Sequence, residues 1–187
     1  MQASTRTVPK KISTIFFDRD GIINDVVMRG TVVGSPRKLD ELTIRDDFNS
    51  FYQQISQLGL NLFVVSNQPD VARKDLSTDA LNLMTEKIET HGTFKEIVYC
   101  THDNDDHCEC RKPKPGMILR LLHKYNLAAD TALIVGDSHK DILAGSAAGI
   151  ETVYLLGSYN ATIRCEPNTV VSNLNELLHH YQLSVAP

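Results

Sequence analysis

Short apolar runs alternate along the chain with segments whose apolar residues repeat at helical spacing. The runs have the length and composition of buried strands, and they lie at 12–17, 60–65, 96–100, 131–135, 151–155 and 169–171. Helix-period stripes are found at about 46–58, 77–88, 115–125, 141–149 and 174–181. Strands that alternate with helices imply right-handed crossovers and a parallel sheet. We therefore expect an α/β fold of Rossmann-like topology, with helices on both faces of the sheet and no large cap domain.

Two segments fall outside this alternation. Residues 25–42 contain Gly30, Gly34 and Pro36 without a clear period, and the stretch is long for a loop in a compact domain. We expect it to be a flap over the functional site, and a partly disordered excursion is the alternative. Residues 1–11 are polar and lack the apolar core of a signal peptide. They predict a flexible tail on a single domain that spans 1–187.

The composition excludes several classes of protein. Hydrophobic residues make up 42% of the chain and charged residues 22%, which is ordinary for a globular protein. The net charge of −4 gives no basic footprint and argues against a nucleic-acid partner. No apolar run has the length needed to cross a membrane. We expect a cytoplasmic monomer whose partner is a small molecule rather than a membrane or a nucleic acid.

Polar side chains follow three of the predicted strands at the point where each strand ends. They are Asp18 and Asp20 after the first strand, Ser66 and Asn67 after the second, and Asp137 with Asp141 after the fourth. Ligands bind at the carboxyl ends of the strands in an open parallel sheet, and carboxylates gathered there form an oxygen-rich site suited to Mg²⁺. The hydroxyl of Ser66 and the amide of Asn67 are suited to hold phosphate oxygens.

The pair Asp18 and Asp20 has its own chemical meaning. Two carboxylates one residue apart repel each other unless a cation or a proton lies between them. One can then bind metal and attack, while its neighbour, kept protonated, donates a proton. The alternative is that the two acids simply open a turn after a strand, with Gly21 allowing the chain to turn sharply.

A fixed positive charge is supplied by Arg111 and Lys112, which are followed by prolines at 113 and 115. A cation beside three acids would attract an anion, above all a phosphoryl group whose charge spreads during transfer. The alternative for these two residues is a solvated loop. The prolines stiffen the loop, which suits a positioned charge better than a mobile one.

Three of the four cysteines lie close together, between 100 and 110. Thiolates and imidazole on one loop are the ligands of tetrahedral Zn²⁺. The predicted ligands are Cys100, His102, Cys108 and Cys110, which fill all four positions of a closed structural site. His107 is the rival imidazole, and His102 is preferred because its spacing from Cys100 mirrors that of the two later cysteines. Free thiols with an exposed histidine are the alternative.

Four motifs in this order resemble those of the haloacid dehalogenase superfamily of phosphohydrolases. They are Phe-Asp-Arg-Asp-Gly, Val-Ser-Asn-Gln, Cys-Arg-Lys-Pro-Lys-Pro-Gly and Val-Gly-Asp-Ser-His-Lys-Asp. The Cys-x-His…Cys-x-Cys-Arg-Lys-Pro pattern is similar to the zinc-loop branch of that superfamily. The branch includes heptose bisphosphatases and histidinol phosphatases, so the resemblance implies a phosphatase that uses Mg²⁺ for chemistry and Zn²⁺ for structure.

The resemblance also implies roles for individual residues. Asp18 would be the nucleophile that becomes aspartyl phosphate, and Asp20 the acid and base whose carbonyl also contacts Mg²⁺. The remaining implied residues are Ser66 and Lys112 for the phosphoryl oxygens, Asp137 for Mg²⁺, and Arg111 for the substrate. An aspartate at position 20 favours hydrolysis over a stalled phosphoryl-enzyme.

Shorter stretches around these motifs indicate the class of substrate. Asn67, Gln68 and Arg73 resemble the heptose-type enzymes, whereas the short zinc loop is closer to the histidinol-phosphatase form. We expect Arg73 and Arg111 to lie near the part of the substrate that is not hydrolysed. The prediction is a sugar phosphate of the heptose 1,7-bisphosphate type, and thus a role in carbohydrate metabolism. The alternatives are histidinol phosphate, or a zinc-stiffened phosphate-binding module without turnover.

Overall fold

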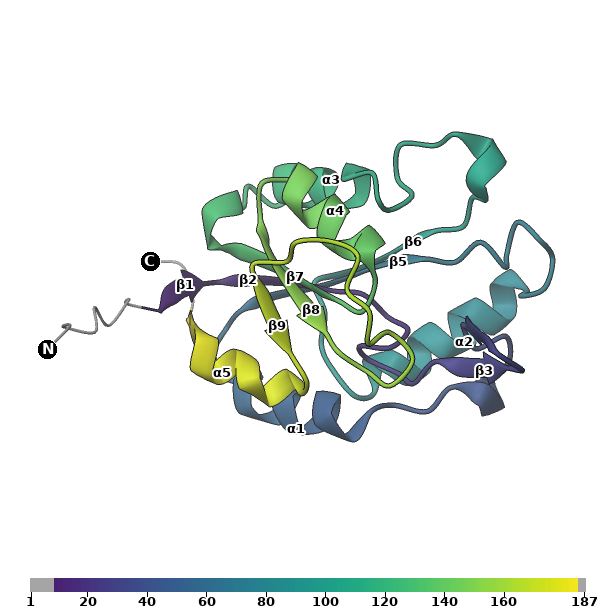
Figure 1. The fold of residues 1–187 in the computed structure, drawn as a ribbon, viewed down its shortest axis with the longest axis horizontal. Helices are drawn as coiled ribbons and strands as arrows, with labels where there is room; N and C mark the ends of the chain where they lie inside the picture. Colours follow the sequence, from purple (N-terminus) through teal and green to yellow (C-terminus); the bar gives the residue numbers. More distant parts are fainter. Residues whose placement is uncertain (1–8, 185–187) are drawn as a thin grey trace, which may run out of the picture.

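Six parallel strands form the central sheet of the computed structural model, which describes residues 9–184 (Figure 1). The strands, in spatial order, are β6 (Glu96–Cys100), β5 (Asn61–Asn67), β2 (Thr14–Phe17), β7 (Ala132–Gly136), β8 (Glu151–Leu155) and β9 (Thr169–Val171). These strands coincide with the six apolar runs, and the predicted fold class is confirmed. The order reverses at β2, which pairs with β5 on one side and β7 on the other. A crevice beyond the carboxyl end of a strand at such a reversal is where α/β sheets bind ligands.

Helices cover both faces of this sheet (Figure 1). One face carries α1 (Asp46–Ile55), α2 (Thr78–Glu89) and α5 (Leu177–His180), and the other carries α3 (Gly116–Lys124) and α4 (His139–Ala147). Short 3₁₀ turns complete the chain at η1 (Leu39–Glu41), η2 (Asn104–Asp106), η3 (Ala129–Thr131) and η4 (Leu174–Glu176). In the part of the chain that the structure describes, no helix combines the length and apolar character needed to cross a bilayer.

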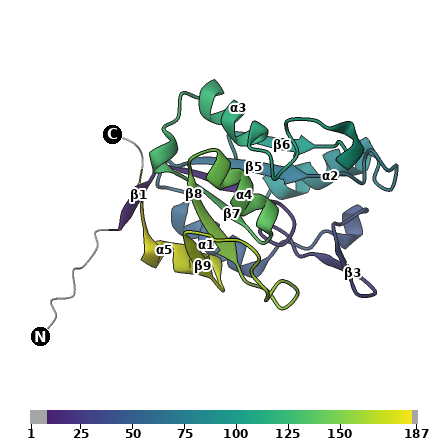
Figure 2. The same ribbon diagram turned by 45° about the horizontal axis from the view of Figure 1, so that its top comes forward.

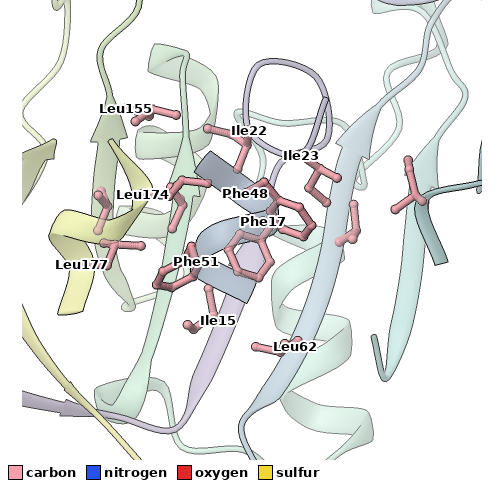
Figure 3. Close-up of a cluster of buried hydrophobic side chains, with 14 of the residues drawn as sticks. Ile15, Phe17, Ile22, Ile23, Phe48, Phe51, Leu62, Leu155, Leu174 and Leu177 are labelled. Carbon is pink, nitrogen blue, oxygen red and sulfur yellow. The ribbon is translucent and has the colours of Figure 1, made fainter. Parts of the chain in front are cut away.

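The two faces explain why Ile15, Phe16 and Phe17 of β2 are all apolar. Phe17 points to the α1 face, where its ring meets Phe48 edge-on at a centroid distance of 5.8 Å (Figure 3). Phe16 points to the opposite face and stacks on Phe63 at 5.2 Å. Both rings are fully buried. A central strand covered on both faces is therefore mostly a continuous apolar run, and Asp18 marks where this strand leaves the core.

The 25–42 segment is an ordered hairpin with a short 3₁₀ turn after it. Strands β3 (Val27–Arg29) and β4 (Val32–Gly34) pair antiparallel, with Gly30 at the turn in a left-handed conformation (φ +66°). Figure 2 shows β3 at the same end of the molecule as the loop that follows β6. Because this is the end where the parallel strands finish, the hairpin lies where a flap over the site would lie.

The two ends of the described chain differ from the sequence prediction. Lys10–Ile12 forms β1, which pairs in parallel with β10 (Tyr181–Leu183). The prediction of a flexible tail is therefore wrong for Lys10 and Lys11, while residues 1–8 lie outside the described part. The predicted helix over 174–181 is also interrupted, because Tyr181 is the first residue of β10. The pattern within 174–181 could not show this, since the partner strand lies about 170 residues earlier.

Candidate active site

Lys112 lies at the centre of the site. Its side chain is 2% exposed, and its Nζ lies 2.9 Å from Asp18 Oδ1, contacts Asp141 Oδ1, and donates to Val65 O at 2.7 Å. Burial lowers the pKa of Lys112, but Asp141 and Asp18 raise it to a net value above its ordinary one, so the ammonium stays charged. A permanently charged ammonium at the end of β2 can bind an anionic group.

Asn67 fixes the backbone of that lysine. Its Nδ2 donates to Lys112 O at 2.9 Å, and its Oδ1 accepts from Lys112 N at 3.0 Å. This two-pronged contact ties the end of β5 to the loop after β6. Asn67 also lines the cavity, so it is placed to meet a ligand as well as to position Lys112.

Three carboxylates gather beside Lys112. Asp18, Asp137 and Asp141 each offer an oxygen, and these oxygens lie within 4.8 Å of one another. Asp18 follows β2 with its N–H bonded to Val135 O at 3.0 Å, and Asp137 follows β7. Gly136 permits the approach, because a Cβ at that position would collide with Asp141. The sequence placed Asp18 and Asp137 at one sheet edge, and the structure brings them together.

The electrostatics of this group favour a bound cation. Burial raises the pKa of Asp18 to about 6, against the lowering effect of Lys112. Burial, Asp18 and Asp141 raise the pKa of Asp137 to about 8. The raised values mean that burial, together with the neighbouring carboxylates, disfavours the ionised forms of Asp18 and Asp137. A hard divalent cation would stabilise the ionised forms, and three carboxylate oxygens are donors that Mg²⁺ prefers.

Asp20 lies outside the carboxylate cluster. Its side chain accepts from Arg19 Nε at 3.0 Å, from Asn24 Nδ2 at 2.9 Å and from Gln68 Nε2 at 2.8 Å. Burial raises the pKa of Asp20. Arg19 and these hydrogen bonds lower it by more than burial raises it, so the net pKa lies below its ordinary value. These contacts favour the ionised carboxylate of Asp20 in the metal-free protein, and its protonation beside a bound cation stays a prediction. The sequence could not show that Arg19, between the two acids, turns inward.

Two other predicted ligands have clear positions. Ser66 Oγ lies at the end of β5, lines the cavity and accepts from Gln68 Nε2 at 3.2 Å. Gln68 itself is fully buried, and its Oε1 accepts from Arg19 Nη2 at 2.9 Å. The prediction that Gln68 binds substrate is wrong for this structure. Its amide instead connects Asp20, Ser66 and Arg19.

A cavity of about 440 Å³ opens over these groups. Its inner residues include Asp18, Ser66, Lys112 and Asp137, and the hairpin contributes Val33 among others. The prediction that the 25–42 segment forms a flap over the site is confirmed. Four arginines also line the cavity, and they are Arg29, Arg37, Arg73 and Arg111. The cavity therefore joins the Lys112 ammonium and the carboxylate cluster to a lining that contains several arginines.

The two arginines predicted to lie near substrate have different partners. Arg111 Nε donates to Asn104 Oδ1 at 3.0 Å and its Nη1 to His102 O at 3.1 Å, both neutral acceptors. Arg73 forms two short bonds to Asp103, from Nε at 2.6 Å and Nη2 at 2.7 Å. Arg111 therefore has the greater capacity to bind an added anion.

The cysteine cluster forms beside the cavity. Cys100, His102, Cys108 and Cys110 bring their ligand atoms within 4.8 Å of one another, and none of these cysteines is in a disulfide. Cys108 Sγ lies 3.6 Å from Cys100 Sγ and 3.4 Å from Cys110 Sγ. A tetrahedral Zn²⁺ with Zn–S bonds near 2.3 Å separates its sulfurs by roughly 3.8 Å, so the group fits such an ion.

The structure separates the two candidate imidazoles. His102 Nδ1 lies 3.3 Å from Cys110 Sγ and 3.7 Å from Cys100 Sγ. His107 is not in the cluster and closes the η2 turn in a left-handed conformation (φ +48°). The cluster therefore contains His102 and not His107, which confirms the preference for His102 in terms of geometry.

Sequence reasoning missed one further contact in the site. Tyr159, on the loop after β8, donates from its hydroxyl to Asp137 Oδ2 at 2.6 Å. Asn160 Nδ2 donates to Asp137 O at 2.7 Å. Gly21 (φ +84°) leaves room for this pair, because a Cβ there would collide with both Asp137 and Tyr159. Nothing in the pattern of 156–168 signals these roles, since the loop lacks periodicity.

Comparisons with known proteins agree with this geometry. The model of the HAD-hydrolase-like family matches residues 109–177. The chain is 33% identical over 153 residues to the D-glycero-beta-D-manno-heptose-1,7-bisphosphate 7-phosphatase of Pasteurella multocida, covering 76% of this chain and 80% of that protein. It is 30% identical over 175 residues to the D-glycero-alpha-D-manno-heptose-1,7-bisphosphate 7-phosphatase of Photorhabdus laumondii, covering 87% and 92%.

A solved structure is similar over nearly the whole fold. The D,D-heptose 1,7-bisphosphate phosphatase of B. bronchiseptica, complexed with magnesium and phosphate, superimposes with a TM-score of 0.79 at 26% identity. The match covers 90% of this chain and 99% of that one. The similarity therefore extends over most of the fold rather than to a single motif.

Proposed function

Since the chain belongs to the HAD-like hydrolase family and is a phosphatase, we propose that it removes one phosphate from a sugar phosphate of the heptose 1,7-bisphosphate type. The names of the Pasteurella and Photorhabdus relatives support this substrate class. Those names differ in the anomer, so the proposal covers the bisphosphate and not one anomer. As a phosphatase, the chain does not fit the alternative of a binding module without turnover.

One observation carries the choice of substrate. The cavity that holds Asp18 and Lys112 is also lined by Arg111, whose described hydrogen bonds go to neutral acceptors. The carboxylate paired with it is Asp103, at 4.0 Å. A guanidinium in this state can grip a second phosphate in two-pronged fashion. Histidinol phosphate, the alternative, has no second phosphate for Arg111 to bind.

The metal chemistry follows from the carboxylate cluster. Asp18 and Asp137 would hold Mg²⁺ with their carboxylates and Asp20 with its backbone carbonyl, while Asp141 lies alongside. When bound, Mg²⁺ would supply positive charge to the phosphoryl oxygens during transfer. The fit rests on the donor set, because Asp18, Asp137 and Asp141 bring carboxylate oxygens within 4.8 Å of one another.

The chain's own residues would carry out two successive displacements. A carboxylate oxygen of Asp18 attacks phosphorus, the bond to the sugar oxygen breaks, and that oxygen takes a proton from Asp20. Water then attacks the aspartyl phosphate, gives a proton to Asp20, and releases phosphate. Ser66 and Lys112 hold the phosphoryl oxygens. Because the pKa of Asp20 is lowered in this structure, Asp20 must take up a proton before the first step.

Zn²⁺ has a separate role in the proposal. Held by the cysteines and His102, it would stiffen the loop that presents Arg111 and Lys112. A single-domain, cytoplasmic monomer with no nucleic-acid or membrane partner stays a prediction from the composition.

The direct test is a panel of phosphorylated metabolites assayed with Mg²⁺. We expect the highest kcat/KM for a heptose 1,7-bisphosphate, lower values for sugar monophosphates, and little turnover of histidinol phosphate. Turnover should stop when Mg²⁺ is chelated and return when it is added back. A clear preference for histidinol phosphate would overturn the substrate class, and turnover that persists in chelator would overturn the role of Mg²⁺.

Replacing Tyr159 with Phe tests how Asp137 is positioned. The substitution removes one hydroxyl, the donor to Asp137 Oδ2, and keeps the ring. Partners of metal ligands are typically worth about 10–100-fold in metal affinity or activity, so we expect the Mg²⁺ dissociation constant to rise by about tenfold. Calorimetric titration with Mg²⁺ measures it directly. Tyr154→Phe is the matched control, because that hydroxyl bonds Asn160 O at a weak 3.4 Å. Unchanged affinity in the Tyr159 variant would show that this contact is only structural.

A further inference from the structure

A series of ion pairs links three segments that line the cavity. From the segment after the hairpin, Arg37 Nε contacts Asp70 Oδ2 at 2.7 Å and its Nη2 contacts Asp75 Oδ2 at 2.7 Å. Asp70 Oδ1 also lies 3.5 Å from Arg73 Nη1. Arg73 in turn forms its two bonds to Asp103 on the zinc loop. Asp70 is thus shared between Arg37 of the flap and Arg73 of its own turn.

Asp70 lies where its ion pairs with Arg37 and Arg73 can affect ligand binding. Asp70 is 9% exposed and lines the cavity together with Arg37 and Arg73. Its backbone carbonyl accepts from the N–H groups of Asp75 and Leu76, at 2.9 and 3.0 Å, so the turn that carries it is fixed. Asp75 differs: its side chain is 45% exposed and is not part of the lining.

The arginines of the cavity are therefore unequal as anion binders. Arg37 uses Nε and Nη2 on two carboxylates, and Arg29 Nη2 contacts Glu41 at 2.8 Å within the flap. Arg73 uses Nε and Nη2 on Asp103, and its Nη1 faces Asp70. A guanidinium already paired with carboxylate offers a phosphate fewer donors and less net charge. Arg111 is the cavity arginine whose hydrogen bonds go to neutral acceptors.

We propose that Asp70 is a specificity-determining residue, which keeps Arg37 and Arg73 from binding a second phosphate and so limits the preference for sugar bisphosphates over monophosphates. This inference rests on the proposed function and deepens it. In this arrangement the second phosphate is held by Arg111 alone among the four cavity arginines, and a monophosphate loses only that one contact. The acidic side chain thus adjusts how strongly the cavity selects for a second anion.

The test is Asp70→Asn, which keeps the shape and removes the charge. Binding of fructose 1,6-bisphosphate and of fructose 6-phosphate is measured by calorimetry with Mg²⁺, in an Asp18→Asn background where neither ligand is consumed. We expect the bisphosphate to bind about tenfold more tightly after Asp70→Asn, as one additional charged hydrogen bond would give. The monophosphate should change by less than about twofold.

Two further variants separate specificity from simple tethering. Asp79→Asn makes the same charge change at an exposed position in the first turn of α2, away from the cavity lining and its arginines, and should leave the ratio of the two affinities unaltered. Adding Arg37→Gln to Asp70→Asn should reduce the gain for the bisphosphate. If Asp70 only ties the flap to the turn, its variant will weaken both ligands alike, and that result overturns the inference. An equal gain for both ligands, or a similar gain in the Asp79 variant, overturns it too.

The failure of this inference can be told from the failure of the proposed function. A parent enzyme that hydrolyses no sugar phosphate, together with a selective gain in the Asp70 variant, would overturn the substrate class and leave the role of Asp70 standing. A parent that hydrolyses heptose bisphosphate while the variant shows no selective gain would overturn the role of Asp70 alone.

Discussion

Asp18→Asn is expected to abolish turnover while the protein stays folded. The amide has nearly the same shape as the carboxylate but is a poor nucleophile, and loss of a nucleophile typically costs about 10³-fold or more in kcat. Lys112 would keep its contacts with Asp141 and with Val65 O. The measurement is steady-state release of phosphate from the best substrate of the panel, with protein purified free of other phosphatases.

Stability gives that prediction a second, independent result. Asp18 has a raised pKa, so its ionised form is disfavoured in the folded, metal-free protein at neutral pH. Removing this charge should leave the thermal midpoint of chelated protein unchanged or higher. Asp130→Asn, on the exposed η3 turn before β7, is the control and should alter neither turnover nor stability. Activity close to that of the parent in the Asp18 variant would show that Asp18 is not the nucleophile.

The sequence predicted the positions of these groups better than their chemical states. The ends of β2, β5 and β7 could be read from apolar runs that stop before Asp18, Ser66 and Asp137, because a strand covered on both faces is mostly apolar until it leaves the core. The order of the strands in the sheet then determines where these ends lie. Since β5 and β7 are the neighbours of β2, their ends must meet at one edge.

The sequence could not show which way the side chains point after the strands end. Arg19 stands in the same short motif as Asp18 and Asp20, yet it is fully buried, with its guanidinium 5.7 Å from the centroid of the Tyr99 ring. That inward turn lowers the pKa of Asp20 and occupies Gln68. No periodicity reports such a contact, because it joins residues that are about fifty or more positions apart.

For the zinc loop, the sequence predicted the ligands but not how the loop contributes to the active site. Its ligands were evident because they lie within eleven residues, and a metal site is specified by local spacing of side chains. Its connection to catalysis was not evident. Arg111 donates to the carbonyl of His102 at 3.1 Å and to Asn104 at 3.0 Å, so the loop that would bind Zn²⁺ also orients a cavity arginine. Lys112 follows Cys110 by two residues and depends on the same segment.

Replacing His102 with Asn should therefore release zinc and lower activity together. Elemental analysis should give about one zinc per chain in the parent and close to none in the variant, because three thiolates leave the tetrahedral site incomplete. The loop would then hold Arg111 and Lys112 less firmly, and we expect kcat/KM to fall about tenfold or more with a lower thermal midpoint. His107→Asn is the matched control, since asparagine tolerates the left-handed conformation found there, and it should retain both zinc and activity. Zinc retained by the His102 variant would remove His102 from the ligand set. Zinc lost without any change in kcat/KM would show that the loop does not position the cavity residues.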